Sequence, residues 1–91
     1  MSMLLTAAVE LAADRGYLNV TRRDLAERVG CSVSLVSHYF DSVGKMRRLI
    51  LAEAIRTENL TLIAQGIINR DRRVETIPVE LKQRALASQA R

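Results

Sequence analysis

The chain is poor in the residue types that build cross-linked, metal-binding or catalytic proteins. Its 91 residues include one cysteine, one proline, one histidine and no tryptophan, and aromatic side chains make up 3%. A single cysteine, Cys31, cannot form a disulfide framework or a thiolate zinc site, and this usage is typical of a reducing cytoplasm. One histidine without clustered carboxylates leaves little for metal or acid–base chemistry. We therefore expect no cofactor, no metal and no enzyme activity.

Long apolar runs are also missing. No stretch approaches the roughly eighteen consecutive apolar residues of a membrane span, and the first residues lack the basic head and apolar run of a signal peptide. The composition, 48% apolar and 26% charged, predicts a folded, cytoplasmic protein rather than a disordered chain. A domain of this size has a thin core and gains from burying more surface against a partner.

The positive charge is concentrated in two parts of the chain. The net charge is +4, and residues 22–48 and 67–91 each contain six basic and three acidic side chains. Residues 1–21 and 49–66 each carry a net charge of −1. We expect a polyanion such as double-stranded DNA to dock on the two basic segments.

Apolar residues recur at helical spacing in the first half of the chain and predict three short helices. The first covers about residues 2–15, with Gly16 as its stop. The second covers about residues 22–29 after the N-cap Thr21, and the third covers about residues 32–39. A short glycine-containing turn joins the second and third helices. This is the layout of a helix-turn-helix that reads DNA.

The third predicted helix has two different faces. One is an apolar stripe that is expected to pack, formed by Leu35, Val36, Tyr39 and Phe40. The opposite stripe carries smaller side chains and is expected to face outward, and it consists of Val33, Ser34, Ser37 and His38. Small outward side chains suit a helix in the major groove, which is about 12 Å wide. Arg22 and Arg23 begin the preceding helix and are placed to reach the groove edge or the phosphates.

These residues together resemble a known family. The run TRRDLAERVGCS from Thr21 to Ser32, followed by the aromatic segment SHYFDS, resembles the DNA-binding domain of the tetracycline-repressor (TetR) family of bacterial regulators. The resemblance covers about residues 4–55. It implies an all-α fold, in which a three-helix head inserts its third helix into the major groove and a long fourth helix follows. It also implies a homodimer on a palindromic operator.

The resemblance and the positions of the residues assign individual roles. The expected base contacts are Arg23, Val33, Ser34, Ser37 and His38. The expected phosphate contacts are Thr21, Arg22, Ser32, Tyr39 and Lys45. The chain departs from the family at Ser37, where tyrosine is common, and at Val43, where lysine is favoured; Lys45 or Arg48 can substitute for that cation.

The second half of the chain predicts a long fourth helix, about residues 44–65, and a short last helix, about residues 78–89. One face of the fourth helix is apolar beyond what a monomer of this size is expected to cover, so we expect a subunit contact there. That face consists of Leu51, Ile55, Leu62 and Ile63. Residues 1–66 are expected to form the DNA-binding domain, and residues 67–91 a basic connector and a helix that completes the dimer or frays.

The predicted function is a homodimeric transcriptional repressor that occupies a palindromic operator. Members of the family usually carry a further domain for ligand binding, whereas only residues 67–91 follow Gly66 here, so no small-molecule inducer is expected. Compact repressors of this kind would suit a phage or mobile element. The alternative is a protein-interaction module, a co-regulator or antagonist built on the same fold.

Overall fold

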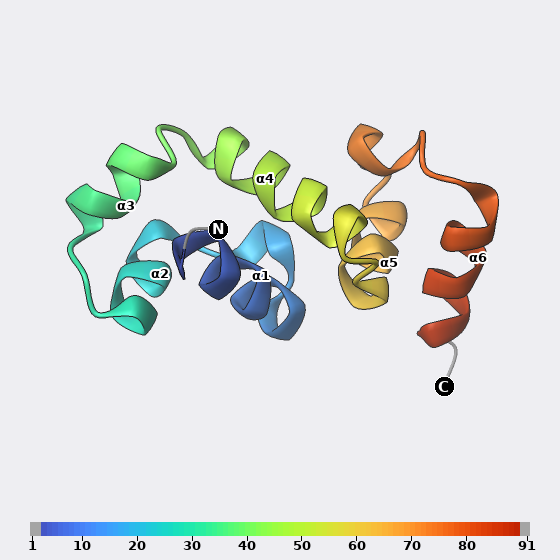
Figure 1. Cartoon of the computed structure of the whole chain (residues 1–91), viewed down its shortest axis with the longest axis horizontal. Coiled ribbons are helices and arrows are strands. Elements are labelled where there is room, and N and C mark those ends of the chain that lie inside the picture. Colours follow the sequence, from blue (N-terminus) through green and yellow to red (C-terminus); the bar gives the residue numbers. More distant parts are fainter. Residues whose placement is uncertain (1–2, 90–91) are drawn as a thin grey trace. The chain divides into compact units, whose positions relative to one another are not determined.

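The computed structural model describes residues 3–89, and over that range it contains helices and no strand (Figure 1). The elements are α1 (Met3–Arg15), η1 (Tyr17–Asn19), α2 (Arg22–Val29), α3 (Val33–Tyr39), α4 (Val43–Arg56), α5 (Leu60–Ile68), η2 (Arg72–Val74) and α6 (Val79–Ser88), where η denotes a short 3₁₀ helix. The predicted all-α class is confirmed.

The chain divides into two compact units inside α4. The N-terminal unit ends at Ile50, and the C-terminal unit begins at Leu51. The sequence analysis placed the boundary at Gly66, which lies within α5. The two boundaries differ because α5 packs against α6, so the residues on either side of Gly66 belong to one compact unit.

The predicted single helix over residues 44–65 is wrong, because α4 and α5 are separate helices. Glu58 has a φ of +53°, a left-handed conformation that cannot continue a right-handed helix. The backbone N–H of Asn59 donates to the carbonyl of Ala54 at 2.7 Å, and the Asn59 side chain accepts from the N–H of Leu62 at 3.2 Å. Asn59 is therefore the N-cap of α5.

The three short helices predicted for the N-terminal unit are confirmed by α1, α2 and α3. Ser2, the predicted start of the first, lies outside the described residues. Gly16 follows α1 with a φ of +91° and donates its N–H to the carbonyl of Ala12 at 2.8 Å. Glycine adopts this backbone conformation without steric cost, so the chain turns away directly after α1.

Packing in the N-terminal unit joins α1 to α2 and η1, and α2 to α3. The largest fully buried side chains of this unit are Tyr17, Leu25, Val36, Phe40, Met46 and Ile50. Arg47 of α4 donates from Nη2 to the backbone carbonyl of Leu18 at 3.1 Å. This bond ties the start of α4 to η1 and leaves Arg47 half-buried.

The C-terminal unit has its own core between α5, η2 and α6. Its buried members are Ile63, Ala64, Val74, Ile77, Leu81 and Ala85, with Ile55, Leu60 and Ile67 packed against them. The last helix is therefore held within its own chain through Leu81 and Ala85, as a packed helix rather than a frayed tail.

The expectation that a monomer leaves one apolar face of residues 44–65 uncovered is wrong. Leu51, Leu62 and Ile63 are each 0% exposed, and Ile55 is half-buried against the core of the C-terminal unit. The physical reason is that the helix breaks at Glu58, which lets α5 and α6 fold together and enclose apolar side chains. Leu51, Leu62 and Ile63 are therefore covered within their own chain.

Close packing at Gly66 gives a first testable prediction. A Cβ atom on Gly66 would lie 2.8 Å from Cγ1 of the buried Val74. We expect Gly66→Ala to lower the free energy of unfolding by about 1–3 kcal/mol through overpacking, although alanine is the better helix former. Urea unfolding followed by circular dichroism measures this.

The matched background for that substitution is Val74→Ala. Removing the two γ-methyl groups leaves the Val74 Cβ, which would lie 3.6 Å from the new atom, an ordinary contact. The Gly66→Ala cost should therefore disappear or reverse in the Val74→Ala background, as a double-mutant cycle reports. An equal cost in both backgrounds would contradict the steric explanation.

Candidate nucleic-acid interface

The start of α2 is fixed by reciprocal hydrogen bonds. The hydroxyl of Thr21 accepts from the backbone N–H of Asp24 at 3.0 Å, and the N–H of Thr21 donates to a carboxylate oxygen of Asp24 at 3.2 Å. Arg15 of α1 contacts the same carboxylate, with Nη1 3.2 Å from Oδ1. This capping box fixes the first turn of α2, where Arg22 and Arg23 lie.

The capping box makes stability depend on pH. Hydrogen bonds from Thr21, with a smaller contribution from the charge of Arg15, lower the pKa of Asp24 below its ordinary value of 3.8. Because the pKa is lower in the folded state, the Asp24 carboxylate stabilises the fold fully at neutral pH. Its contribution is lost as the pH falls from the ordinary pKa through the folded one.

We therefore expect Asp24→Asn to lower the unfolding temperature at pH 7 and to make progressively less difference below pH 3.8. Thermal unfolding across a pH series measures this. Glu27→Gln is the matched control, because Glu27 is an exposed carboxylate on the same helix. If the two variants differed from the unmodified chain equally at every pH, the role of the capping box would be refuted.

The turn between α2 and α3 is tight because of Gly30. Gly30 has a φ of +79°, and the N–H groups of Gly30 and Cys31 both donate to the carbonyl of Ala26, at 2.8 and 3.0 Å. Ser32 then caps α3 by accepting from the N–H of Leu35 at 3.1 Å. Two helices separated by so short a turn have the geometry of a helix-turn-helix.

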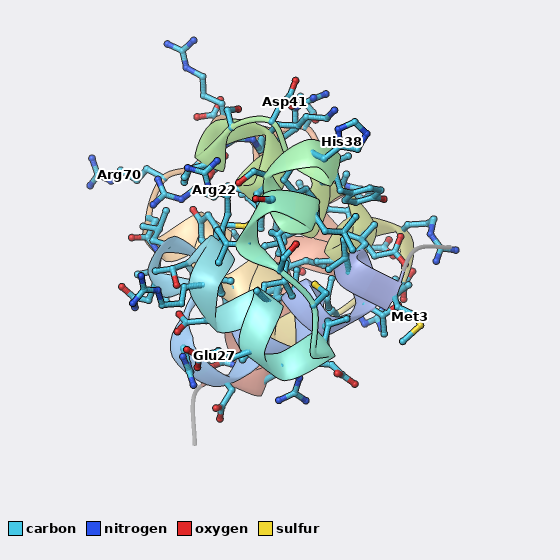
Figure 2. All side chains as sticks on the ribbon, turned by 90° about the vertical axis from the view of Figure 1, so that its left-hand side faces the viewer. Met3, Arg22, Glu27, His38, Asp41 and Arg70 are labelled. Atoms are coloured by element: carbon cyan, nitrogen blue, oxygen red, sulfur yellow. The ribbon has the colours of Figure 1, made fainter. Side chains whose placement is uncertain are left out.

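Helix α3 is held to the unit along a narrow line and is exposed elsewhere. Val36 and the following Phe40 are buried, whereas Ser34 and His38 are exposed and Ser37 is half-buried. Figure 2 looks onto α3 and shows His38 on one side of this helix and Arg22 on the other. The predicted outward stripe is therefore accessible, with Ser37 at its edge.

The prediction that Leu35 packs inside is wrong, because its side chain is 51% exposed. Each residue advances about 100° around an α-helix, so Leu35 points well away from the buried Val36. Tyr39 is 37% exposed, and its ring meets Phe40 edge-on, with ring centres 4.6 Å apart. Part of the predicted packing stripe thus belongs to the exposed surface.

Arg22 and Arg23 form no salt bridge within residues 3–89, and Arg23 is exposed. Arg22 donates from Nη1 to the hydroxyl of Ser37 at 3.4 Å, a long hydrogen bond that places its guanidinium beside α3. By contrast, Arg28 contacts Glu10 at 3.2 Å. Arg22 and Arg23 therefore carry positive charge that no acidic side chain of the described residues pairs with.

The structure brings the predicted contact residues onto one unit. Nine of them lie on α2, on α3 or at the caps of those helices, and Lys45 lies on α4. The ammonium of Lys45 is 3.4 Å from a carboxylate oxygen of Asp41, so a phosphate would compete with that partner. Leu35 is the exposed residue that the sequence analysis missed. Periodicity could not show this exposure. Leu35 and Tyr39 are four residues apart on one side of the helix, and that spacing is also typical of a packing stripe.

Two findings complete the description of this unit. No helix between Met3 and Gln89 is both long and apolar enough to cross a membrane. Comparison with known sequences matches residues 4–45 to the family model described as bacterial regulatory proteins, tetR family, while neither curated proteins nor solved structures give a match. The matched segment begins in α1, contains all of α2 and α3, and ends in α4. Residues 4–45, somewhat less than half of the chain, therefore match the helix-turn-helix head of the tetR family of bacterial regulators.

Proposed function

We propose that this protein is a homodimeric transcriptional repressor that binds a palindromic operator through α2 and α3. The observation that carries the proposal is the exposed face of α3 beside two arginines that have no acidic partner within the described residues. A DNA phosphate supplies the negative charge that these arginines do not meet among the described residues, and a guanine edge supplies paired acceptors. The protein would act in the cytoplasm, at the nucleoid.

The proposed contacts divide into two kinds. Arg23 and the exposed face of α3 would meet base edges in the major groove, where the small side chains of Ser34 and Ser37 let the helix backbone approach closely. The phosphate contacts would fix the position of the head on the duplex, and they are Thr21, Arg22, Ser32, Tyr39 and Lys45. The cations among them make binding weaken steeply with salt.

A second copy of the chain is the proposed partner in dimerisation. Three apolar side chains of the C-terminal unit, Ile68, Val79 and Leu86, are exposed. Val79 and Leu86 are two helical turns apart and therefore share one face of α6. Covering them in a symmetric dimer would present two heads to half-sites about one turn of DNA apart, or a multiple of it.

Selection of bound DNA from a random pool by the purified chain tests this proposal. We expect an enriched inverted repeat whose spacing reports the distance between the two heads, and gel shifts in which the enriched sequence is retarded at far lower protein concentration than a scrambled one. Light scattering of the complex should give two chains per duplex. Failure to enrich any motif would refute sequence-specific binding.

A protein-interaction module is the alternative that a specific observation favours. Val33 and Leu35 leave apolar surface on α3, and the hydroxyl of Ser37 is already engaged by Arg22. A regulator that binds another protein through α3 would show no specific retardation of DNA by the chain alone. The same selection experiment therefore separates the two functions.

A further inference from the structure

Helix α3 carries an unusual set of side chains for a helix that reads bases. Its sequence is VSLVSHY, so it has no arginine, lysine, asparagine, glutamine, aspartate or glutamate. Those side chains form the standard pairings with guanine, adenine and cytosine. What α3 offers the major groove is therefore hydroxyl groups, one imidazole and apolar side chains.

Two of the apolar side chains are exposed on α3. Leu35 is 51% exposed and Val33 is 44% exposed. Leu35 lies between Ser34 and the buried Val36 in sequence, about 100° around the helix from each of them. The only apolar group that a base presents in the major groove is the 5-methyl group of thymine. Leucine at this position matches that group in chemistry.

We propose that Leu35 reads the 5-methyl group of a thymine in each half-site, an inference that rests on the proposed DNA-binding function. Discrimination between the bases that α3 contacts would then come from apolar contact rather than from bidentate hydrogen bonds. Recognition of guanine would be left to Arg23 of α2, whose forked donors fit the O6 and N7 atoms of that base.

Replacing thymine by deoxyuridine tests the proposal, because it removes the methyl group and leaves base pairing intact. Each thymine of the selected operator is replaced in turn, and affinity is measured by fluorescence anisotropy. Burying one methyl group corresponds to about a fourfold change in affinity. We expect one position per half-site to lose about that factor, and Leu35→Ala to bind the thymine and deoxyuridine operators equally at that position.

Two further variants keep the test decisive. Leu18→Ala is the matched control, because Leu18 is an exposed leucine of the same unit outside α2 and α3; it should keep the full sensitivity to the methyl group. Leu35→Gln places an amide that pairs with adenine, so repeated selection with this variant should change the preferred base at the same position.

The outcomes distinguish the inference from the function on which it rests. The inference is overturned if Leu35→Ala keeps the same thymine-to-deoxyuridine ratio, if no thymine methyl affects the unmodified chain, or if Leu35→Gln selects an unchanged operator. In each of those cases sequence-specific binding itself persists. Only the absence of any enriched DNA overturns the proposed function as well.

Discussion

Phe40→Ala is expected to destabilise the N-terminal unit by about 3–5 kcal/mol, the usual cost of deleting a buried aromatic ring. Phe40 is 0% exposed, and its ring supports that of Tyr39. Small domains have only about 0.05–0.15 kcal/mol of stability per residue, so this loss is comparable with the whole stability of the unit. Urea unfolding should show it, and DNA binding should be lost with the fold.

Leu35→Ala provides the matched control for stability, because Leu35 lies in the helix that Phe40 caps but is half exposed. We expect Leu35→Ala to change the free energy of unfolding by well under half of the Phe40→Ala effect, because it removes less buried apolar surface. If the two variants were equally stable, Phe40 would not be a principal core residue of this unit.

Arg23→Ala is expected to reduce the preference for the operator over random DNA by about 1–3 kcal/mol, the value of one good bidentate base contact. That corresponds to roughly a 5- to 150-fold loss of discrimination. Binding to random DNA should change much less, because phosphate contacts made by other residues supply that affinity. Fluorescence anisotropy with both duplexes measures the ratio.

Arg28→Ala is the control for net charge. Arg28 lies on the same helix, but its guanidinium is paired with Glu10, so its loss removes a charge without removing a proposed base contact. Arg23→Lys tests geometry, because an ammonium keeps the charge and lacks the planar fork. The assignment of Arg23 fails if Arg28→Ala loses discrimination to the same extent as Arg23→Ala. It also fails if neither Arg23→Ala nor Arg23→Lys loses discrimination.

The head could be predicted from sequence because its signals are local. Thr21 and Asp24 are three residues apart and cap α2 from within that segment. Gly30 ends the same helix, and Ser32 begins the next one. Each of these signals acts within about one helical turn, so it does not depend on how the rest of the chain packs. The contacts of these residues with DNA stay predictions.

The break between α4 and α5 could not be read from periodicity. Leu51, Ile55 and Leu62 keep helical spacing across it, so the apolar pattern continues where the backbone does not. Asn59 gave a local signal, since asparagine is a favoured N-cap, but asparagine also occurs inside helices. Glu58 lies at this junction with a left-handed φ. The presence of a glutamate in the sequence does not predict that conformation.

The predictions that Leu35 is packed and that Leu62 lies on an uncovered face were wrong for the same reason. Sequence pattern says which side chains are apolar, but which of them are covered depends on the neighbouring elements. Leu35 belongs to a helix that presents little more than one line to its unit, centred on the buried Val36. Leu62 belongs to a helix that packs against α6. Both outcomes are set by tertiary structure.

The hydroxyl groups of Thr21 and Ser32 have a further consequence for binding. Each already accepts a hydrogen bond from its own helix, from Asp24 and from Leu35 respectively, which leaves its hydrogen as a donor for another acceptor. Because capping has already restricted these side chains to one rotamer, a phosphate that accepts from them would cost little additional conformational entropy. The bonds that begin the two helices thus preorganise two neutral donors, whose contribution to affinity would not depend on counterion release.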